Sequence, residues 1–305
     1  MTQKFGRNYR LTIYPIDGGP AIVITMPFTI NFTCNRNINA SINTLDIDIY
    51  NLGEPNRLRI FQDINVLGEY VNAPLNADGQ STAFFNILLE AGYGNTLYRV
   101  FYGKMMQASS AREGTNIITR IHATSNLLDL AGTQIQLTLE AGQSVDNVLN
   151  TLIQQYPNLK LGAIGSRPDV LYSPVVLNDN VWNLLKTYSE GQVYEDNGSI
   201  YILHNQEALA KITQINDTTG LLQTPRRQLG LLTVTTLMET SIDQLNQQVQ
   251  LLSTILPEFN GTYKVIGITH QGMISAAVSG NFQSIFLLSA PLPQAGFTVV
   301  KQGAN

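Results

Sequence analysis

The side chains that could perform chemistry are three histidines, one cysteine and scattered carboxylates. His122, His204 and His270 each lie in a strand-like segment, and none has a second histidine or a carboxylate at the sequence spacing of a metal-binding motif. Cys34 lies on the apolar face of a predicted strand, so we interpret it as a small buried hydrophobic residue rather than a nucleophile. A single cysteine also excludes an intramolecular disulfide and a zinc site built on several cysteines. The sequence therefore predicts no catalytic residue, no bound metal and no cofactor.

Other patterns with chemical meaning fall short of a site. Any two of the scattered Asp and Glu residues could be paired as a glycosidase dyad, and their spacing selects none. The stretch AGYGN (91–95) lacks the ending of a phosphate-binding loop and the glycine spacing of a dinucleotide fingerprint, so it is interpreted as a turn. Arg226 and Arg227 are too few for a basic patch, and we interpret them as anchoring a linker or pairing with an acidic neighbour.

The composition indicates a globular chain. Of the 305 residues, 44% are apolar and only 13% are charged, and the chain contains 28 Asn and 22 Gln. A surface rich in neutral amides hydrogen-bonds laterally without charge repulsion, which favours an assembly, although compositional drift also explains it. The length predicts two or three domains.

Charge and hydropathy exclude two classes of partner. The net charge of −4, with no long basic run, argues against binding driven by nucleic-acid phosphates. No apolar run reaches the roughly 18 residues of a membrane span, and the N-terminus has no signal-peptide core. We therefore expect the chain to fold in a reducing cytoplasm.

Period-two alternation dominates the first 125 residues and predicts strands. In FTINFTCN (28–35) apolar and polar side chains alternate, and LDIDI (45–49) repeats the pattern. Pro55 suits the first turn of a short helix, and Leu58, Phe61 and Ile64 follow at helical spacing. Further strand patterns follow up to residue 125.

The segment 126–225 has a different pattern. After one strand, Ser144 is a good N-cap for an amphipathic helix, and a second helix is predicted from about Asp179. The pair Asn197-Gly198 fits a type I′ turn between two strands. We predict a small α+β domain here, with two helices and a hairpin.

Strand patterns return in 226–290 and end before a tail at 291–305. The tract GNTLYRVFYG (94–103) resembles NGTYKVIGI (260–268), with a turn, Tyr, a basic residue and Val in the same order. Duplication of a β domain and chance similarity between hairpins both explain this echo. The predicted fold class is α+β, mainly β, with β domains at 1–125 and 226–290 on either side of the middle domain.

Several longer stretches carry a family resemblance. PFTINFTCNRNINASINTLDIDIYNLGEPNRLRIFQD (27–63) is similar to the opening of baseplate hub proteins of contractile-tailed bacteriophages, the late-control or tail-hub family. NILLEAGYGNTLYRVFYGKMMQASSAREGTNIITRIHA (86–123), the two helices, the EDNG hairpin and NGTYKVIGITHQG (260–272) follow in the family's order. The resemblance spans about residues 5–290. ATSN (123–126) departs from it, because many relatives have an acidic residue after this strand.

The resemblance implies two antiparallel β-barrel domains of the tail-tube type in each chain. It further implies a homotrimer whose six such domains form a ring, joining the sixfold tail tube to the threefold central spike and leaving a channel for DNA. The implied partners are tail tube or tube-initiator proteins, the spike, and the tape measure and baseplate wedge proteins, without sequence-specific nucleic acid or membrane. The implied location is the virion tail baseplate, assembled in the host cytoplasm, and no fused lysozyme-like domain is expected.

The sequence also leaves two alternative functions open and suggests where subunits meet. The chain could be the hub of a bacterial contractile injection system or tail-like bacteriocin, which differs only in the particle, or a lytic enzyme of the tail. The candidate subunit-interface strands are those around Ile47 and Val265, whose hairpins we predict to meet head-to-tail. A lumen of neutral to negative charge is expected from the net charge.

Overall fold

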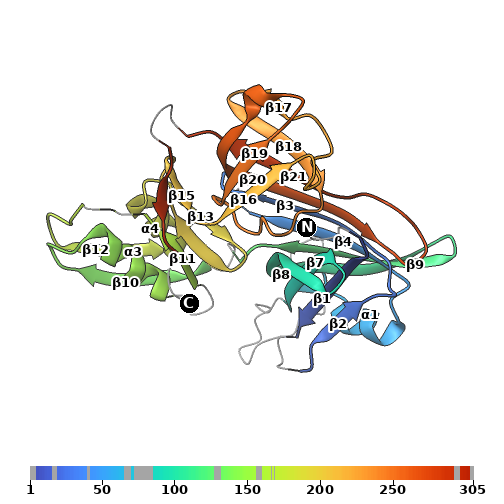
Figure 1. Cartoon of the computed structure of the whole chain (residues 1–305). Coiled ribbons are helices and arrows are strands. Elements are labelled where there is room, and N and C mark those ends of the chain that lie inside the picture. The colour runs from blue at the N-terminus through green and yellow to red at the C-terminus, as the bar shows by residue number, and fades with distance from the viewer. Residues whose placement is uncertain are drawn as a thin grey trace.

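A large antiparallel sheet and a smaller α+β unit make up the structure, a computed structural model (Figure 1). The structure describes residues 5–15, 19–39, 42–64, 70–71, 85–126, 132–155, 160–165, 167, 169–291 and 296–302. Strands predominate over helices, so the predicted fold class, α+β and mainly β, is confirmed.

The described strands of the large sheet come from both ends of the chain. They are β1 (Arg7–Tyr14), β2 (Ile22–Thr25), β3 (Ile30–Asn37), β4 (Thr44–Tyr50), β7 (Phe85–Tyr93), β8 (Thr96–Glu113), β9 (Asn116–Thr124), β16 (Ile212–Asn216), β17 (Arg226–Gln228), β18 (Leu231–Leu237), β19 (Gln248–Leu252), β20 (Gly261–Ile274) and β21 (Phe282–Ser289).

The remaining elements are smaller. They are α1 (Glu54–Ile60), β5 (Asp63–Ile64), β6 (Tyr70–Val71), β10 (Gln134–Leu139), α3 (Val145–Gln154), β11 (Lys160–Ile164), β12 (Val175–Asn180), α4 (Val181–Tyr188), β13 (Val193–Asp196), β14 (Ser199–Ile202), β15 (Glu207–Leu209), η1 (Pro257–Phe259) and β22 (Thr298–Val300).

The strands β1 to β4 and β7 to β9 (the N-terminal β segment) and the strands β16 to β21 (the C-terminal β segment) lie edge to edge in one sheet. The path is β17-β18-β21-β20-β3-β4-β9-β8-β7-β1-β2, with β19 also on β20 and β16 parallel to β19. The seam between the segments is the antiparallel pair β3–β20, in which Cys34 lies opposite His270. A separate link joins the two segments, because Nη1 of Arg7 on β1 donates to the carbonyl oxygen of Gly280, between β20 and β21, at 2.6 Å. The two β segments therefore form one continuous sheet.

Alternation along the strands explains where the cores lie. On β3, Ile30, Phe32 and Cys34 are buried while the residues between them are not, as the period of two predicts. One apolar cluster lies under the N-terminal β segment and another under the C-terminal one. A third lies within the middle segment, between its helices and strands.

The middle segment, the elements from β10 to β15, contains two helix caps and a turn that are visible in the sequence. Ser144 caps α3 by accepting from the backbone NH of Asn147 at 3.3 Å, as predicted. Asn180, one residue beyond the expected start, caps α4 by accepting from the NH of Asn183 at 2.8 Å. Asn197 and Gly198 both have positive φ, 52° and 84°, which confirms the type I′ turn between β13 and β14.

The first helix is shorter than its sequence pattern predicts. It ends at Ile60, because the backbone of Phe61 turns to an extended ψ of 120°. Gln62 then exchanges two backbone hydrogen bonds with Ala108 of β8, at 3.0 and 2.8 Å. Pairing with a strand distant in sequence therefore replaces the helical bonds, and Ile64 belongs to β5 rather than to the helix. The helix predicted at Pro55 is present, and the last positions of its apolar pattern, Phe61 and Ile64, lie beyond its end.

The two echoing tracts each open a long strand. β8 has 18 residues and pairs with β7 before it and β9 after it, and β20 has 14 residues and pairs with β19 before it and β21 after it. Each strand has an irregularity near the echo, between Arg99 and Phe101 and between Val265 and Gly267. Duplication, closure of each segment as a barrel, and the domain boundaries at 125, 225 and 290 stay predictions.

Candidate assembly interface and the joint that supports it

The two residues named as candidate interface positions lie inside the chain. Ile47 is buried in the core of the N-terminal β segment, and Val265 in that of the C-terminal segment. Their strands do not pair, because β3 lies between β4 and β20. Lys264 and Ile266 are buried as well, so the strand around Val265 is covered on both faces by this chain. A role at a subunit interface stays a prediction, and it would use other residues of these strands.

The free strand edges lie elsewhere. β17 and β2 end the path of the large sheet, and β16 ends its branch, without a further hydrogen-bonded neighbour among the described residues. An open edge presents unpaired NH and C=O groups, which is a ready site for another chain. Exposed apolar side chains accompany these edges, with Val23 on β2 and Ile212 on β16.

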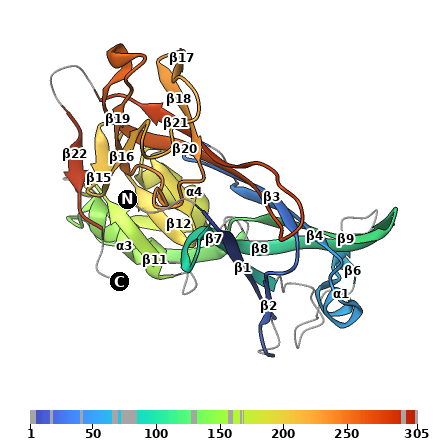
Figure 2. The same ribbon diagram turned by 45° about the vertical axis from the view of Figure 1, so that its right-hand side comes forward.

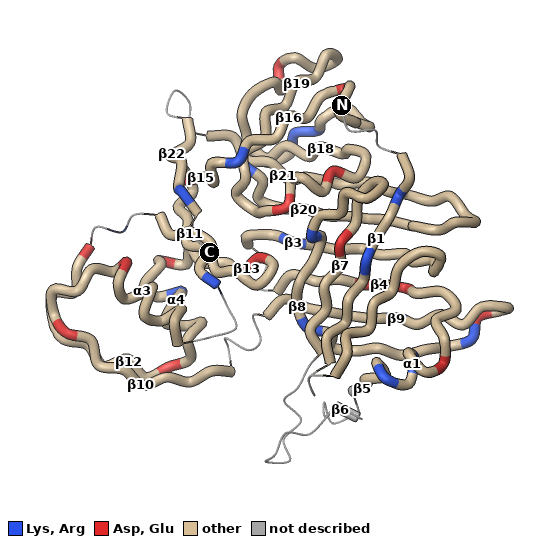
Figure 3. The backbone as a smooth tube through the Cα atoms, turned by 60° about the horizontal axis from the view of Figure 1, so that its bottom comes forward, with Lys and Arg blue, Asp and Glu red and all other residues tan. Residues whose placement is uncertain are grey.

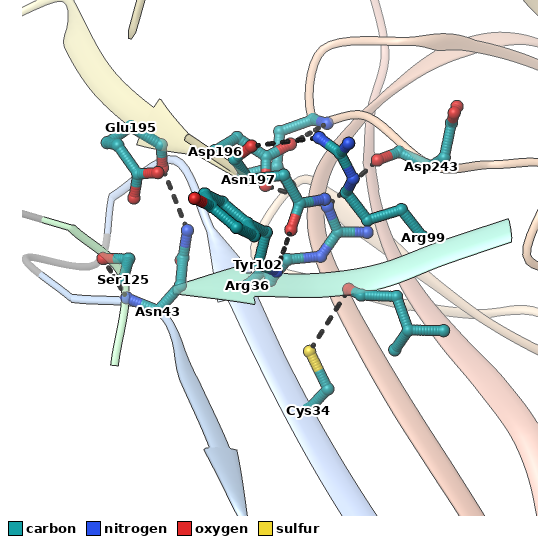
Figure 4. A network of polar contacts seen from close by, with 12 residues as sticks. Cys34, Arg36, Asn43, Arg99, Tyr102, Ser125, Glu195, Asp196, Asn197 and Asp243 are labelled. Atoms are coloured by element: carbon teal, nitrogen blue, oxygen red, sulfur yellow. Dashed lines mark hydrogen bonds and ion pairs between the residues drawn. The ribbon is translucent and has the colours of Figure 1, made fainter. Parts of the chain in front are cut away.

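A buried ion pair fastens the middle segment to the large sheet (Figure 4). Arg36 points from β3 to Asp196 at the end of β13, and the Nη1–Oδ1 distance is 2.8 Å. The same Nη1 donates to the carbonyl oxygen of Asp243 at 3.0 Å. The second carboxylate oxygen of Asp196 accepts from the NH of Leu245 at 3.0 Å. One carboxylate therefore joins the N-terminal β segment to a loop before β19.

The hairpin tip beside this ion pair makes further contacts with the N-terminal β segment. The side chain of Asn197 accepts from the NH of Tyr102 on β8 at 2.9 Å. The side chain of Asn43 donates to the carbonyl oxygen of Glu195 at 3.0 Å. A carboxyl oxygen of Glu195 accepts from the NH of Gly198 at 2.6 Å, which closes the turn. We define Arg36, Asn43, Glu195, Asp196 and Asn197 as the hairpin joint.

A second contact links the same hairpin to the C-terminal β segment. The hydroxyl group of Tyr194 donates to the carbonyl oxygen of Leu245 at 3.4 Å and accepts from the side chain of Asn246 at 3.0 Å. The ring of Tyr194 stacks on that of Tyr201, with centroids 5.2 Å apart. The hairpin is thus held by both β segments, which positions the middle segment relative to the sheet.

The potential catalytic side chains are dispersed. His270 is buried and bonds Ser284 Oγ through Nδ1 at 2.8 Å, and burial lowers its pKa to about 3. His122 Nδ1 lies 2.7 Å from Asp46 Oδ1 on the surface, a pairing that the sequence spacing of 76 residues concealed. Cys34 is buried, as predicted, and burial raises the pKa of its thiol to about 12, which disfavours the thiolate.

The part of the chain that the structure describes contains neither a candidate metal site nor a membrane-spanning helix. No group of three or more His, Cys, Asp and Glu side chains there could hold a metal ion. No described helix is long and apolar enough to cross a membrane.

Glu195 gives the hairpin joint a dependence on pH. Burial raises the pKa of its carboxyl group to about 8, against the opposing effect of the Gly198 NH. The unfolded chain releases this proton near the ordinary pKa of 4.5, so the contribution of Glu195 to stability is complete below pH 4.5 and is lost as the pH rises towards 8.

We therefore expect Glu195→Gln to unfold at a higher temperature than the wild type at pH 9, and the difference to shrink towards pH 5. Glutamine keeps the oxygen that accepts from Gly198 and cannot ionise. Melting curves of both proteins between pH 5 and 9 measure this. A difference independent of pH would contradict the prediction, and Glu258→Gln on the exposed η1 provides the matched control.

The fold is that of tail proteins. A prophage MuSo2 43 kDa tail protein from Shewanella oneidensis superposes with a TM-score of 0.59 at 10% identity, over 93% of this chain and 96% of that one. A tail protein from Neisseria meningitidis gives 0.56 at 10% identity, with the same coverages. The E. coli c3393 protein, a component of the type VI secretion system, gives 0.53 at 9% identity, over 91% and 77%. No curated protein matches the sequence.

The particular family follows from the sequence. Residues 11–273 match the family described as Baseplate hub gp41. The chain belongs to this family, which confirms the resemblance to baseplate hub proteins. It is a structural, non-enzymatic component of a phage tail baseplate, so the alternative of a lytic enzyme is wrong.

Proposed function

We propose that the chain is the subunit of a trimeric hub ring that joins the sixfold tail tube to the threefold central spike. The observation that carries this proposal is the seam β3–β20, which unites two β segments in one sheet. If each β segment is one tube-like unit, a single chain holds two such units at a fixed position and orientation relative to each other. Three chains then present six units, which satisfies both symmetries.

The long strands support the two-unit arrangement. β8 and β20 both start at the echoing tracts and both pair with the strand before and the strand after them. We assign the units to residues 1–125 and 226–290, with 126–225 as the middle domain, whose β16 extends into the large sheet by pairing with β19. The hairpin joint fastens that domain to the large sheet, and Figure 2 shows its helices and strands beside the sheet.

The remaining roles follow from this arrangement. The ring leaves a channel through which DNA passes, with a wall of neutral to negative charge, in keeping with the net charge of −4. Its partners are the tail tube or tube-initiator proteins on one side and the spike on the other, with the tape measure and wedge proteins nearby. Residues of β4 and β20 other than Ile47, Val265 and the buried neighbours of Val265 contact a neighbouring copy. Assembly takes place in the host cytoplasm.

The test is a cryo-EM map of the isolated tail, together with the mass of the purified chain by light scattering. We expect three copies around the axis, with both β segments in the ring, because three chains supply six units. Six copies, or a chain that lies outside the central axis, would overturn the proposal. The particle in which the map is made also separates a phage tail from a bacterial injection system.

A further inference from the structure

An exposed apolar surface covers the outer end of the C-terminal β segment, where β17 lies in Figure 1. A groove of about 570 Å³ there is lined by Leu222, Arg226 and Ile255, among others. Ile255 is 71% exposed, and Leu229, at the tip of the β17–β18 hairpin, is 94% exposed. We define Leu222, Arg226, Arg227, Leu229 and Ile255 as the apical surface.

Leu229 occupies a position that the hairpin itself does not favour. Its φ is 50° and that of Gly230 is 81°, so both central residues of the turn are left-handed. Such a turn prefers Asn-Gly, as in the β13–β14 hairpin of this same chain, and a leucine there is strained. The backbone of Leu229 is strained and its large apolar side chain is almost fully exposed, so this residue does not stabilise the fold of the single chain. We therefore interpret Leu229 as a residue that contacts another molecule.

The apical surface also carries unpaired positive charge. Arg226 and Arg227 belong to the edge strand β17 and are exposed, and neither guanidinium makes an ion pair within the described ranges. Asp217, which also lines the groove, is bonded by the hydroxyl group and the NH of Thr254. The sequence leaves two interpretations of the arginine pair, a linker anchor or a partner for an acidic neighbour. Asp217 lines the same groove as Arg226, but no ion pair joins either guanidinium to an acidic side chain within the described ranges.

A surface of the opposite charge lies on the middle segment. β10 and β12 pair only with each other in the described sheets, and Thr138 lies opposite Val176. By the alternation of strands, Glu140 continues the outward row of Thr138. Tyr172, just before β12, is 92% exposed, and Val170 and Asp169 beside it are exposed as well. We define Glu140, Asp169, Val170, Tyr172 and Val176 as the ribbon surface.

The two surfaces are complementary and lie at separate ends of the molecule. One offers leucines and isoleucine with two guanidinium groups, and the other offers tyrosine and valines with two carboxylates. In Figure 1 the β17 hairpin and the β10–β12 ribbon are well apart, and in Figure 3 acidic residues (red) are spread over the region of α3, β10 and β12. One chain therefore cannot bring its own two surfaces together, whereas a second copy can.

We infer that the apical surface of one copy binds the ribbon surface of the next. Different surfaces meet in such a contact, so its repetition closes a ring when the rotation allows. The apolar side chains form the centre, and the charge pairs set orientation and the rate of association. This inference rests on the proposed trimer and names the residues that join its copies.

The first test exchanges the charges. Arg226→Glu combined with Arg227→Glu places like charges across the contact, as does Glu140→Lys combined with Asp169→Lys. Each double variant is expected to weaken self-association by at least about tenfold, and a chain that carries all four changes is expected to recover it, because its charges are again opposite across the contact. The measurement is mass by light scattering against protein concentration. The matched control, Arg112→Glu on the exposed end of β8, is expected to associate as the wild type does.

The second test uses engineered cysteines. Leu229→Cys and Tyr172→Cys both change exposed residues, and the native Cys34 is buried and stays silent. Under oxidation, a mixture of the two single variants is expected to give the mixed crosslink in preference to the crosslink formed by either variant alone. Leu229→Asn provides a variant that folds at least as well, because asparagine suits the turn, and it is expected to associate more weakly.

The outcomes separate this inference from the proposed ring. The inference would be overturned if the protein is a trimer, both charge-reversal variants associate as the wild type does, and the two single-cysteine variants form no mixed crosslink. The proposed ring would then still stand. A chain that stays monomeric at every concentration and forms no crosslink would also overturn the inference, because the surfaces would then belong to other tail proteins. A cryo-EM map without a ring would instead overturn the proposed function.

Discussion

Replacing Arg36 by methionine is expected to lower the free energy of unfolding by about 3–5 kcal/mol, the usual cost of removing one partner of a buried ion pair. The side chains of Arg36 and Asp196 are both buried, so water cannot take the place of the lost partner. The carboxylate of Asp196 would keep only the NH of Leu245, and the carbonyl oxygen of Asp243 would lose its donor. The measurement is unfolding in urea.

The position of the pair adds a second readout. The single tryptophan, Trp182, lies in the core of the middle segment, so its fluorescence follows that segment, while far-UV circular dichroism follows the large sheet. In the wild type the two transitions are expected to coincide. In Arg36→Met they are expected to separate, because the hairpin joint no longer couples the two parts. Coincident transitions at an unchanged urea midpoint would contradict this.

Two control variants make the result specific. Arg10→Met removes an exposed pair with Glu90 and is expected to leave the urea midpoint where it is. Arg36→Met combined with Asp196→Leu removes both buried charges and is expected to recover most of the loss, because no unpaired charge is left. The comparison separates the cost of an orphaned charge from the loss of packing.

Replacing Gly272 by alanine is expected to cost about 1–3 kcal/mol, the range for overpacking a filled core. Gly272 lies in β20 opposite Phe32 of β3, at the seam between the two β segments. A Cβ atom there would lie 2.5 Å from the ring of Phe32 and 2.9 Å from that of Phe282. Both rings are buried, so neither can move aside without opening the seam.

Gly132→Ala is the matched control for this prediction. Among the described residues, apart from its chain neighbours, none has an atom within 4 Å of a Cβ atom built on Gly132, so the same added methyl group is expected to leave stability unchanged or slightly higher. Urea midpoints of the two variants, followed by circular dichroism, measure the difference. Equal midpoints would show that the seam tolerates the added volume, and the tight packing between β3 and β20 would then not hold the segments together.

Patterns that act within a few residues, such as apolar alternation, helix caps and turns, correctly predicted the strands, helix start and hairpin in which they occur. Alternation along 28–35 and 45–49 identified two central strands, because one face of each strand is buried. Ser144 and the Asn197-Gly198 turn identified a helix start and a hairpin, because a side chain bonding a nearby NH, or a residue that tolerates positive φ, acts within a few residues. The order of such signals was enough to indicate the hub family.

Contacts between distant residues were decided only by the tertiary structure. The helix after Gly53 stops at Ile60 because Gln62 pairs with Ala108, and His122 meets Asp46 because β9 lies beside β4. Arg36 occupies one of the alternating buried positions along β3, but its partner Asp196 is 160 residues away in the sequence. The sequence echo between the two β segments predicts an interface around Val265, whereas the structure buries Val265 on a strand with neighbours on both edges. A sequence pattern states which face of a strand is apolar, whereas the order of strands in the sheet determines which residues meet across it.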